Sequence, residues 1–395
     1  MKRILYLHAG AELYGADRVL LELIKGLNKN EFEAHVILPT DGILVSALKE
    51  VGAKVEIINY PILRRKYFNP KGILNYFMSY NRYSKQVAKY AQSNNIDLIH
   101  NNTTAVLEGI YLKKKLKLPL IWHVHEIIVR PKVISDFINF LMGRYADRII
   151  TVSNAVATHI RKSRFIDDEQ VNVIYNGIDN TVYHQIDATK VREKFGISRD
   201  SIVIGMVGRV NAWKGQGDFV EAVTPILEKN STAIAFIAGS AFEGEEWRVE
   251  ELDDRISSLS VSSQIKRIDY YSNTTELYNM FDIFVLPSTN PDPLPTVVLE
   301  AMACGKPIVS YRHGGVCEMV VNDSNGLLVT PNFVKHLSIA IQCLLENSEL
   351  RKEFGEKSEK RQKELFSLQS YIDNFVEEYI EQINTRNTSK LKQIK

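Results

Sequence analysis

Two acidic residues, Asp292 and Glu300, stand eight positions apart in the segment PDPLPTVVLEAMACGKPIV (291–309). Its first three prolines, Pro291, Pro293 and Pro295, prevent a helix before position 295, and proline is tolerated at the first helical position, so we predict a helix from about 295 to 304. The amides at such a helix start bind anions, whereas carboxylates accept hydrogen bonds from hydroxyls. The pair therefore favours sugar hydroxyls as partners, with a phosphate at the helix start. Alternatively, Glu300 only complements the helix dipole and Asp292 only forms a turn.

A basic, glycine-containing segment, VGRVNAWKGQGDF (207–219), places Arg209 and Lys214 five residues apart. A planar guanidinium and a compact ammonium on one loop suit a diphosphate, whose charge must be neutralised as a bond to it breaks. The alternative is a solvated basic turn without a ligand.

A second glycine-containing segment, HAGAELYGADRVL (8–20), leads from an apolar run into a helical pattern. Gly10 and Gly15 permit a tight turn and leave backbone amides open to an anionic group. The spacing is neither the dinucleotide fingerprint nor a P-loop, so it disfavours a dehydrogenase and a P-loop nucleotidase. A purely structural glycine turn is the competing interpretation.

The elements that carry these loops alternate between short apolar runs and longer amphipathic stretches, which is typical of βαβ units with parallel sheets. Helix 15–28 shows the helical period well. The alternation restarts after the Asn-Gly turn in VIYNGIDNTVYH (173–184). We therefore expect an α/β protein with two doubly wound, Rossmann-like domains, whose ligands bind beyond the carboxyl ends of the strands, in the cleft between the domains. The expected parts are 1–180, 181–366, a further helix at 367–384, and a polar tail at 385–395.

The bulk composition is that of a soluble globular protein, with 395 residues, 45% hydrophobic and 24% charged, and a net charge of +2. That balance gives no support to nucleic-acid binding. Three cysteines form neither an even disulfide framework nor a metal-like pair, which favours a reducing compartment such as the cytoplasm. No apolar stretch reaches the length of a membrane span or a signal peptide.

The ordered set of motifs resembles the retaining family 4 glycosyltransferases of the GT-B fold. An acid, seven residues and a Glu, followed by AMACGKPIV and HGG, is similar to the donor site of that family. The segments YGADRVL, TVSNAVATHI, VIYNGID, GRVNAWKG and LYNMFDIFVLPS extend the resemblance over nearly the whole chain. The resemblance implies a nucleotide-diphosphate-sugar donor, a glycan or lipid-linked acceptor, bacterial polysaccharide or glycoconjugate synthesis, and a last helix that crosses back to the first domain.

The resemblance also implies roles for single residues. Arg209 and Lys214 would hold the donor diphosphate, Glu300 the ribose and Asp292 the transferred sugar. His125, rather than His123, matches the cleft histidine of the family and would contact the sugar or orient the substrates, although a core histidine is the alternative. The remaining positions implied are the donor-contacting segment Leu294, Pro295, Thr296 and Val297, and a phosphate or acceptor loop of Tyr14, Gly15, Ala16 and Asp17.

No metal or cofactor is expected, because the candidate sites contain no Asp-x-Asp pair and no His/Cys cluster, and two cations can replace a metal's charge. Two departures from the family pattern concern the sugar: Asp292 stands where Glu is usual, and Pro295, which has no amide hydrogen, stands where Gly is usual. A less hydroxylated donor sugar, such as a 6-deoxyhexose, is therefore a hypothesis. A sugar-nucleotide epimerase of the same architecture and a non-catalytic nucleotide-sugar or glycan-binding protein are the alternatives.

One further segment, 61–90, holds seven Lys or Arg and seven aromatic residues without an acidic residue. Such a segment can lie on anionic lipid headgroups at the inner face of the cell membrane, with each basic side chain adding roughly 1 kcal/mol. KKKLK (113–117) extends the basic surface. Nucleic-acid binding is disfavoured because no single-strand-binding fold accompanies the segment. The alternative is a helix that buries its aromatic residues in the core.

Overall fold

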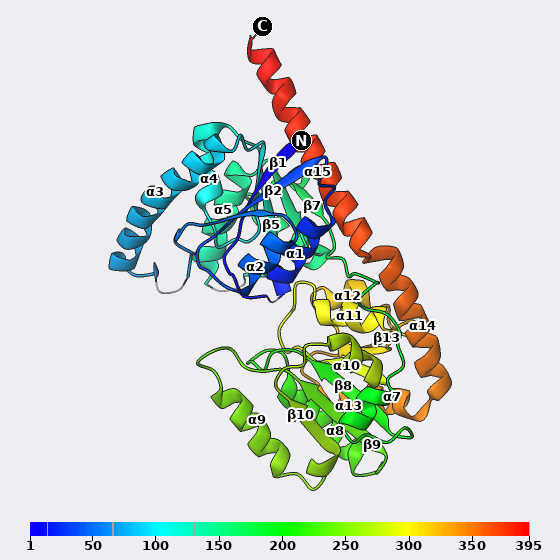
Figure 1. Cartoon of the computed structure of the whole chain (residues 1–395). Helices are drawn as coiled ribbons and strands as arrows, with labels where there is room; N and C mark the ends of the chain where they lie inside the picture. Colours follow the sequence, from blue (N-terminus) through cyan, green and yellow to red (C-terminus); the bar gives the residue numbers. More distant parts are fainter. Residues whose placement is uncertain (14, 65–66, 129–130, 395) are drawn as a thin grey trace. The chain divides into compact units, whose positions relative to one another are not determined.

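The computed structural model describes residues 1–13, 15–64, 67–128 and 131–394, which form two compact units. Unit 1 comprises Met1–Gly177 with Leu368–Lys395, and unit 2 comprises Ile178–Ser367. Each unit is built on one parallel sheet with helices, as the alternation of apolar runs and amphipathic stretches predicted (Figure 1).

The sheet of unit 1 has seven strands in the order β3-β2-β1-β4-β5-β6-β7. Its strands are β1 (Lys2–Leu7), β2 (Phe32–Leu38), β3 (Lys54–Ile57), β4 (Leu98–Asn101), β5 (Leu120–Val124), β6 (Arg148–Thr151) and β7 (Val171–Val173). Its helices are α1 (Gly15–Gly26), α2 (Ile43–Glu50), α3 (Pro70–Ser93), α4 (Glu108–Leu116), α5 (Lys132–Tyr145), α6 (Asn154–Arg161) and α15 (Leu368–Ile394). Because β1, β4 and β5 are neighbouring parallel strands, the residues that follow them meet beyond the carboxyl ends of these strands.

The sheet of unit 2 has six strands in the order β10-β9-β8-β11-β12-β13. Its strands are β8 (Ile202–Val207), β9 (Ala233–Ala238), β10 (Ile265–Ile268), β11 (Ile283–Leu286), β12 (Ile308–Tyr311) and β13 (Gly326–Val329). Its helices are α7 (Thr189–Lys194), α8 (Gln216–Leu227), α9 (Trp247–Ser257), α10 (Thr274–Met280), α11 (Thr296–Ala303), α12 (Val316–Met319), α13 (Val334–Glu346) and α14 (Ser348–Leu365). Strands β8 and β11 pair directly, so the loops that follow them are adjacent.

The last helix, α15, packs against unit 1 through buried aromatic and aliphatic side chains that join the core of β1, β2 and α1. Gly26, at the end of α1, permits the approach, since a Cβ there would lie 2.0 Å from Ile372 Cδ1. Glu378 fixes the helix further by accepting hydrogen bonds from Arg148 Nε at 3.1 Å and Asn172 Nδ2 at 2.8 Å. The crossing-back helix that the resemblance implied is thus present, and it continues through the expected tail region to Ile394 (Figure 1, red).

Throughout the described ranges, none of the helices combines the length and the apolar character that crossing a membrane requires.

Candidate active site

In unit 2, the two loops singled out in the sequence meet through an ion pair. Lys214, on the loop from β8 to α8, donates to Asp292 Oδ2, on the loop from β11 to α11, over 3.0 Å. Ser288 Oγ donates to the same carboxylate oxygen at 2.6 Å. The Lys214 and Asp292 side chains are only 17% and 15% exposed, so the pair is partly withdrawn from water. The sequence suggested separate ligand groups for these two side chains, a diphosphate for Lys214 and a sugar for Asp292. In the structure they form an ion pair with each other.

Glycines determine the backbone around this pair. Gly215 adopts a left-handed conformation with φ +82°, and a Cβ there would lie 1.9 Å from the carbonyl oxygen of Pro287. Behind the acidic loop, Gly314 has φ +68°, and its Cβ would lie 2.4 Å from the carbonyl oxygen of Asp292. The amide of Gly315 donates to that same carbonyl at 2.8 Å. The HGG motif therefore acts as the support on which the Asp292 loop rests.

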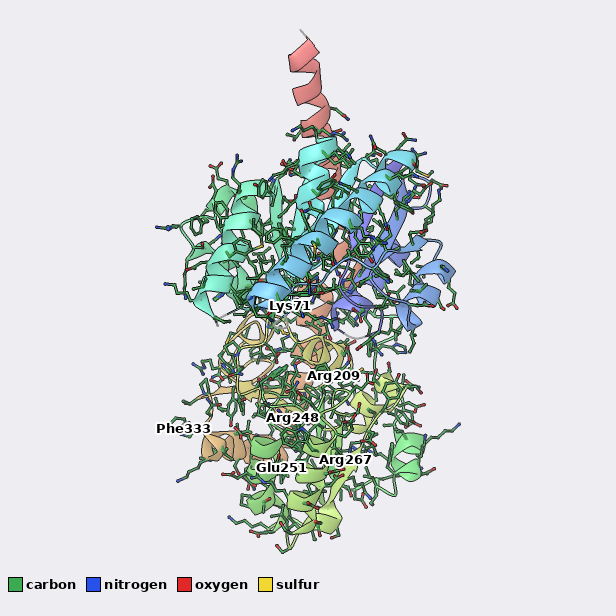
Figure 2. All side chains as sticks on the ribbon, turned by 90° about the vertical axis from the view of Figure 1, so that its left-hand side faces the viewer. Lys71, Arg209, Arg248, Glu251, Arg267 and Phe333 are labelled. Carbon is green, nitrogen blue, oxygen red and sulfur yellow. The ribbon has the colours of Figure 1, made fainter. Side chains whose placement is uncertain are left out.

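Arg209, labelled in Figure 2, lies on the same β8 loop as Lys214 but has a different support. Its guanidinium stacks over the ring of Phe242, 4.0 Å from the centroid, which is a favourable cation–π arrangement. Gln216 Nε2 donates to the backbone oxygen of Arg209 at 2.8 Å and fixes the loop. The two cations of the loop therefore have different supports: an aromatic face for Arg209 and a carboxylate for Lys214.

Helix α11 begins at Thr296, and Pro295 occupies its N-cap position with φ −69°. No side chain in the described residues caps this end, so the amides of the first turn, at Thr296 and Val297, are oriented for an anionic group. Glu300 lies one turn further on and is buried, accepting a hydrogen bond from the Tyr278 hydroxyl at 2.6 Å. Burial and the Glu300 carboxylate raise the pKa of Tyr278 well above its usual value, so the phenol keeps its hydrogen and orients the carboxylate.

In unit 1, the candidate histidine, His125, follows β5 and is partly exposed, whereas His123 is fully buried within the strand. Their rings lie 3.9 Å apart. Burial lowers the pKa of His125 to about 3, so its imidazole is neutral at physiological pH. Of the implied phosphate or acceptor loop, Gly15, Ala16 and Asp17 form the first turn of α1, and Tyr14 lies outside the described residues.

Several polar residues at this edge were not predicted. His8 Nε2 lies 2.6 Å from Asp17 Oδ1, and Asn102 follows β4 between His8 and His125. Glu126 accepts from the Thr103 hydroxyl at 2.6 Å, and burial raises the pKa of its carboxyl group. Unlike Asp17, which the sequence had indicated, the side chains of His8, Asn102, Thr103 and Glu126 closely follow the ends of parallel strands, and that position is the signal that could have identified them.

The described residues contain no group of three or more His, Cys, Asp or Glu side chains arranged to hold a metal ion. Metal-independent transfer stays a prediction.

Two Rossmann-like parallel sheets, with the candidate donor residues on the loops of the second, are the architecture of GT-B glycosyltransferases. Residues 14–182 match the family Glycosyltransferase Family 4, and residues 187–361 match Glycosyl transferases group 1. The chain therefore belongs to the GT-B glycosyltransferases of group 1 and family 4, and it is a sugar-transferring enzyme.

Among relatives, the chain is 25% identical over 365 residues to the N,N'-diacetylbacillosaminyl-diphospho-undecaprenol alpha-1,3-N-acetylgalactosaminyltransferase of Campylobacter jejuni, covering 87% of this chain and 89% of that one. It is 26% identical over 314 residues to spore coat protein SA of Bacillus subtilis, covering 75% and 82%. Among solved structures, HepE of Anabaena in complex with UDP and glucose is similar, with a TM-score of 0.83, 26% identity, and coverage of 95% of this chain and 99% of HepE.

Proposed function

We propose that this enzyme transfers a sugar from a nucleoside diphosphate sugar to an acceptor hydroxyl with retention at the anomeric carbon, in the synthesis of a bacterial surface polysaccharide or other glycoconjugate. The observation that carries the proposal is the Lys214–Asp292 pair at 3.0 Å, at the edge of the unit 2 sheet where Arg209 and the start of α11 also lie. An ammonium already held by a carboxylate next to a helix start is suited to a ligand that is anionic at one end and hydroxylated at the other.

The chemistry follows from this charge distribution. When the bond between the anomeric carbon and the phosphate oxygen breaks, negative charge accumulates on the leaving diphosphate. Arg209, Lys214 and the first amides of α11 would stabilise that charge without reorganising. The acceptor oxygen bonds to the anomeric carbon on the face that the diphosphate leaves, and its hydrogen passes to a phosphate oxygen. Asp292 would hold the transferred sugar and Glu300 the ribose, while His125 would contact the sugar or orient the substrates.

The donor class has independent support from a similar protein. HepE has been solved with UDP and with UDP-glucose. We propose that the present chain also takes a nucleoside diphosphate sugar, and the short Asp292 side chain motivates a 6-deoxyhexose as the sugar. A panel of sugar nucleotides tests this by thermal stabilisation, because a ligand at about 100 times its Kd adds roughly 2.7 kcal/mol to folding stability. Tighter binding and faster turnover of an ordinary hexose donor would reject the 6-deoxyhexose.

Site variants test the assignment of roles. Lys214→Ala should lower kcat about 100- to 1,000-fold, which is the usual cost of losing one preorganised donor to a developing charge. Glu300→Ala should chiefly raise the KM for the donor, because the ribose is remote from the bond that breaks. Lys335→Ala, an exposed lysine on α13 of the same unit, is the matched control and should match wild type.

Two further measurements separate the alternatives. The anomeric coupling constant of the product, measured by NMR, distinguishes retention from inversion. Incubation with sugar nucleotide alone distinguishes an epimerase, which would convert the donor without an acceptor. Unchanged product formation in both Lys214→Ala and Glu300→Ala would contradict the site assignment, and binding without any turnover would favour the non-catalytic alternative.

We also propose peripheral contact with an anionic membrane, which places the enzyme at the inner face of the cell membrane. Helix α3, where Figure 2 labels Lys71, exposes the apolar side chains Ile73, Leu74, Phe77 and Met78. Tyr76 on the same helix is buried, so only some of the aromatic residues of 61–90 belong to the core. Residues 65 and 66 lie outside the described part. Flotation with anionic liposomes should carry the wild type but not Leu74→Glu/Phe77→Glu, and a soluble wild type at low salt would contradict the contact.

A further inference from the structure

A buried asparagine joins the histidines of unit 1. Asn102 follows β4, lies between the ends of β1 and β5, and is 1% exposed. Its Nδ2 lies 3.0 Å from His8 Nδ1, and its Oδ1 lies 3.1 Å from His123 Nδ1 and 3.2 Å from His125 Nε2. One amide group therefore contacts three imidazoles that come from two different strand ends.

The backbone around this asparagine is fixed independently of the histidines. The Asn102 amide donates to the carbonyl oxygen of Leu7 at 2.9 Å, which ties the end of β4 to the end of β1. The indole of Trp122, fully buried in β5, donates to the carbonyl oxygen of Thr103 at 2.8 Å. The amide group is therefore presented by a rigid turn rather than by a mobile loop.

The amide and the imidazoles determine one another's hydrogen positions, because an asparagine oxygen only accepts and its nitrogen only donates. The Asp17 carboxylate, 2.6 Å from His8 Nε2, requires a hydrogen on that nitrogen. The Asn102 nitrogen faces His8 Nδ1 at 3.0 Å, and because an amide nitrogen only donates, His8 presents a lone pair at Nδ1. The Asn102 oxygen consequently faces His123 and His125, and His125 must carry its hydrogen on Nε2.

We infer that Asn102 is a positioning residue that holds His125 in one tautomer, with Nε2–H bonded to the protein and the Nδ1 lone pair available to a substrate hydroxyl. His125 is partly exposed, and among the described residues no partner is recorded for its Nδ1. Toward the substrate, His125 then accepts a hydrogen bond, while its only ring hydrogen is donated to Asn102. The inference rests on the proposed function, because it takes His125 to be in contact with substrate.

The tautomer can be tested without any activity assay. Protein labelled with ¹⁵N in its histidine rings distinguishes protonated from unprotonated ring nitrogens by NMR, and His125→Gln assigns the signals. The wild type should show a hydrogen on Nε2 of His125. Asn102→Leu should release the ring to a mixture of tautomers, whereas Asn139→Ala, which removes a buried asparagine of α5 without a recorded contact to these histidines, should leave the spectrum unchanged. A wild-type hydrogen on Nδ1 of His125 overturns the inference.

Kinetics test the positioning role. Asn102→Leu should lower kcat at least tenfold with little change in the donor KM, and should cost no more when added to His125→Ala, because the two residues act as one unit. Asn102→Asp keeps an acceptor for His125, so it should recover much of kcat. Its carboxylate should favour protonation of His125, so that activity is lost at a higher pH than in wild type on acidification.

The outcomes are separable from those of the proposed function. Additive losses for Asn102→Leu and His125→Ala indicate general damage to unit 1 and overturn the inference. Full transfer activity in His125→Ala does the same. Inversion at the anomeric carbon, or no reaction with sugar nucleotides, overturns the proposed function and leaves the NMR result on the tautomer standing.

Discussion

Substitution of His100 should change how the stability of unit 1 depends on pH. His100 lies in β4, fully buried, 2.7 Å from the Tyr379 hydroxyl and stacked on Phe375 at 5.3 Å. Burial lowers its pKa from 6.5 to about 3. Below pH 6.5 the unfolded chain therefore binds a proton that the folded chain does not, and the free energy of unfolding falls as the pH falls. A pH of 5 is 1.5 units below the pKa of histidine in the unfolded chain, so the free energy of unfolding is about 2 kcal/mol lower there than at neutral pH.

The variant that isolates this loss is His100→Phe, which keeps an aromatic ring but cannot titrate. Replacing Trp213 and Trp247 with Phe leaves Trp122, buried in β5, as the fluorescent reporter of unit 1. Urea unfolding in this background, at pH 7.5 and 5.0, gives the pH dependence of stability with and without His100. Glu108 acts in the opposite sense, because burial raises its pKa to about 8, but its contribution is common to both proteins and cancels in the difference.

Stability of His100→Phe should therefore fall by about 2 kcal/mol less between these two pH values than stability of the parent. The absolute stability of the variant is expected to be lower at pH 7.5, since the hydrogen bonds of His100 to the Tyr379 hydroxyl and to His123 Nδ1 are lost. Only the pH dependence is diagnostic. An identical pH dependence in the two proteins would show that His100 takes up a proton in the folded state, and would refute the reasoning.

Two further predictions concern the supports of the candidate site and of α15. Gly314→Ala should lower kcat/KM at least tenfold, because its Cβ would lie 2.4 Å from the carbonyl oxygen of Asp292. Gly244 also has a positive φ, but a Cβ there would meet nothing within 4 Å, so Gly244→Ala should stay close to wild type in the same assay. Arg148→Met should leave the buried Glu378 carboxylate with one partner fewer and cost about 1.5–3 kcal/mol, seen as faster hydrogen exchange in α15; unchanged exchange would contradict this role for the ion pair.

The fold was largely predictable because local rules determine most of its elements. Prolines that cannot lie inside a helix led us to predict one at about 295–304, and the structure has α11 at Thr296–Ala303. Three strands that the apolar runs did not indicate, β7, β10 and β13, are only three or four residues long, and all three lie at a sheet edge. Short edge strands carry too few apolar residues to show a period, so their pairing depends on the finished sheet.

The sequence indicated some residues of the candidate site one by one, but not the contacts between them. The sequence indicated Lys214 and Asp292 separately, yet their ion pair joins positions 78 residues apart and depends on β8 and β11 being neighbours. The position of Asn102 beside His8 likewise follows from β4 pairing with β1, which no spacing in the sequence reveals. Strand order in the folded sheet is the missing information in both cases.

In unit 1, histidines within a strand and the candidate site histidine beyond a strand end differ in their contacts. His35 lies inside β2, is fully buried, and has two polar partners, Glu33 Oε1 at 2.6 Å and the Tyr90 hydroxyl at 3.0 Å. Both ring nitrogens of His35 therefore have hydrogen-bond partners within the protein. His125 lies beyond the end of its strand, and its ring is held at Nε2 by Asn102 Oδ1. Buried polar groups usually contribute less to the stability of a folded protein than apolar groups of the same volume. Polar residues gathered at the carboxyl edge, rather than within the sheet, are therefore better explained by a ligand than by folding.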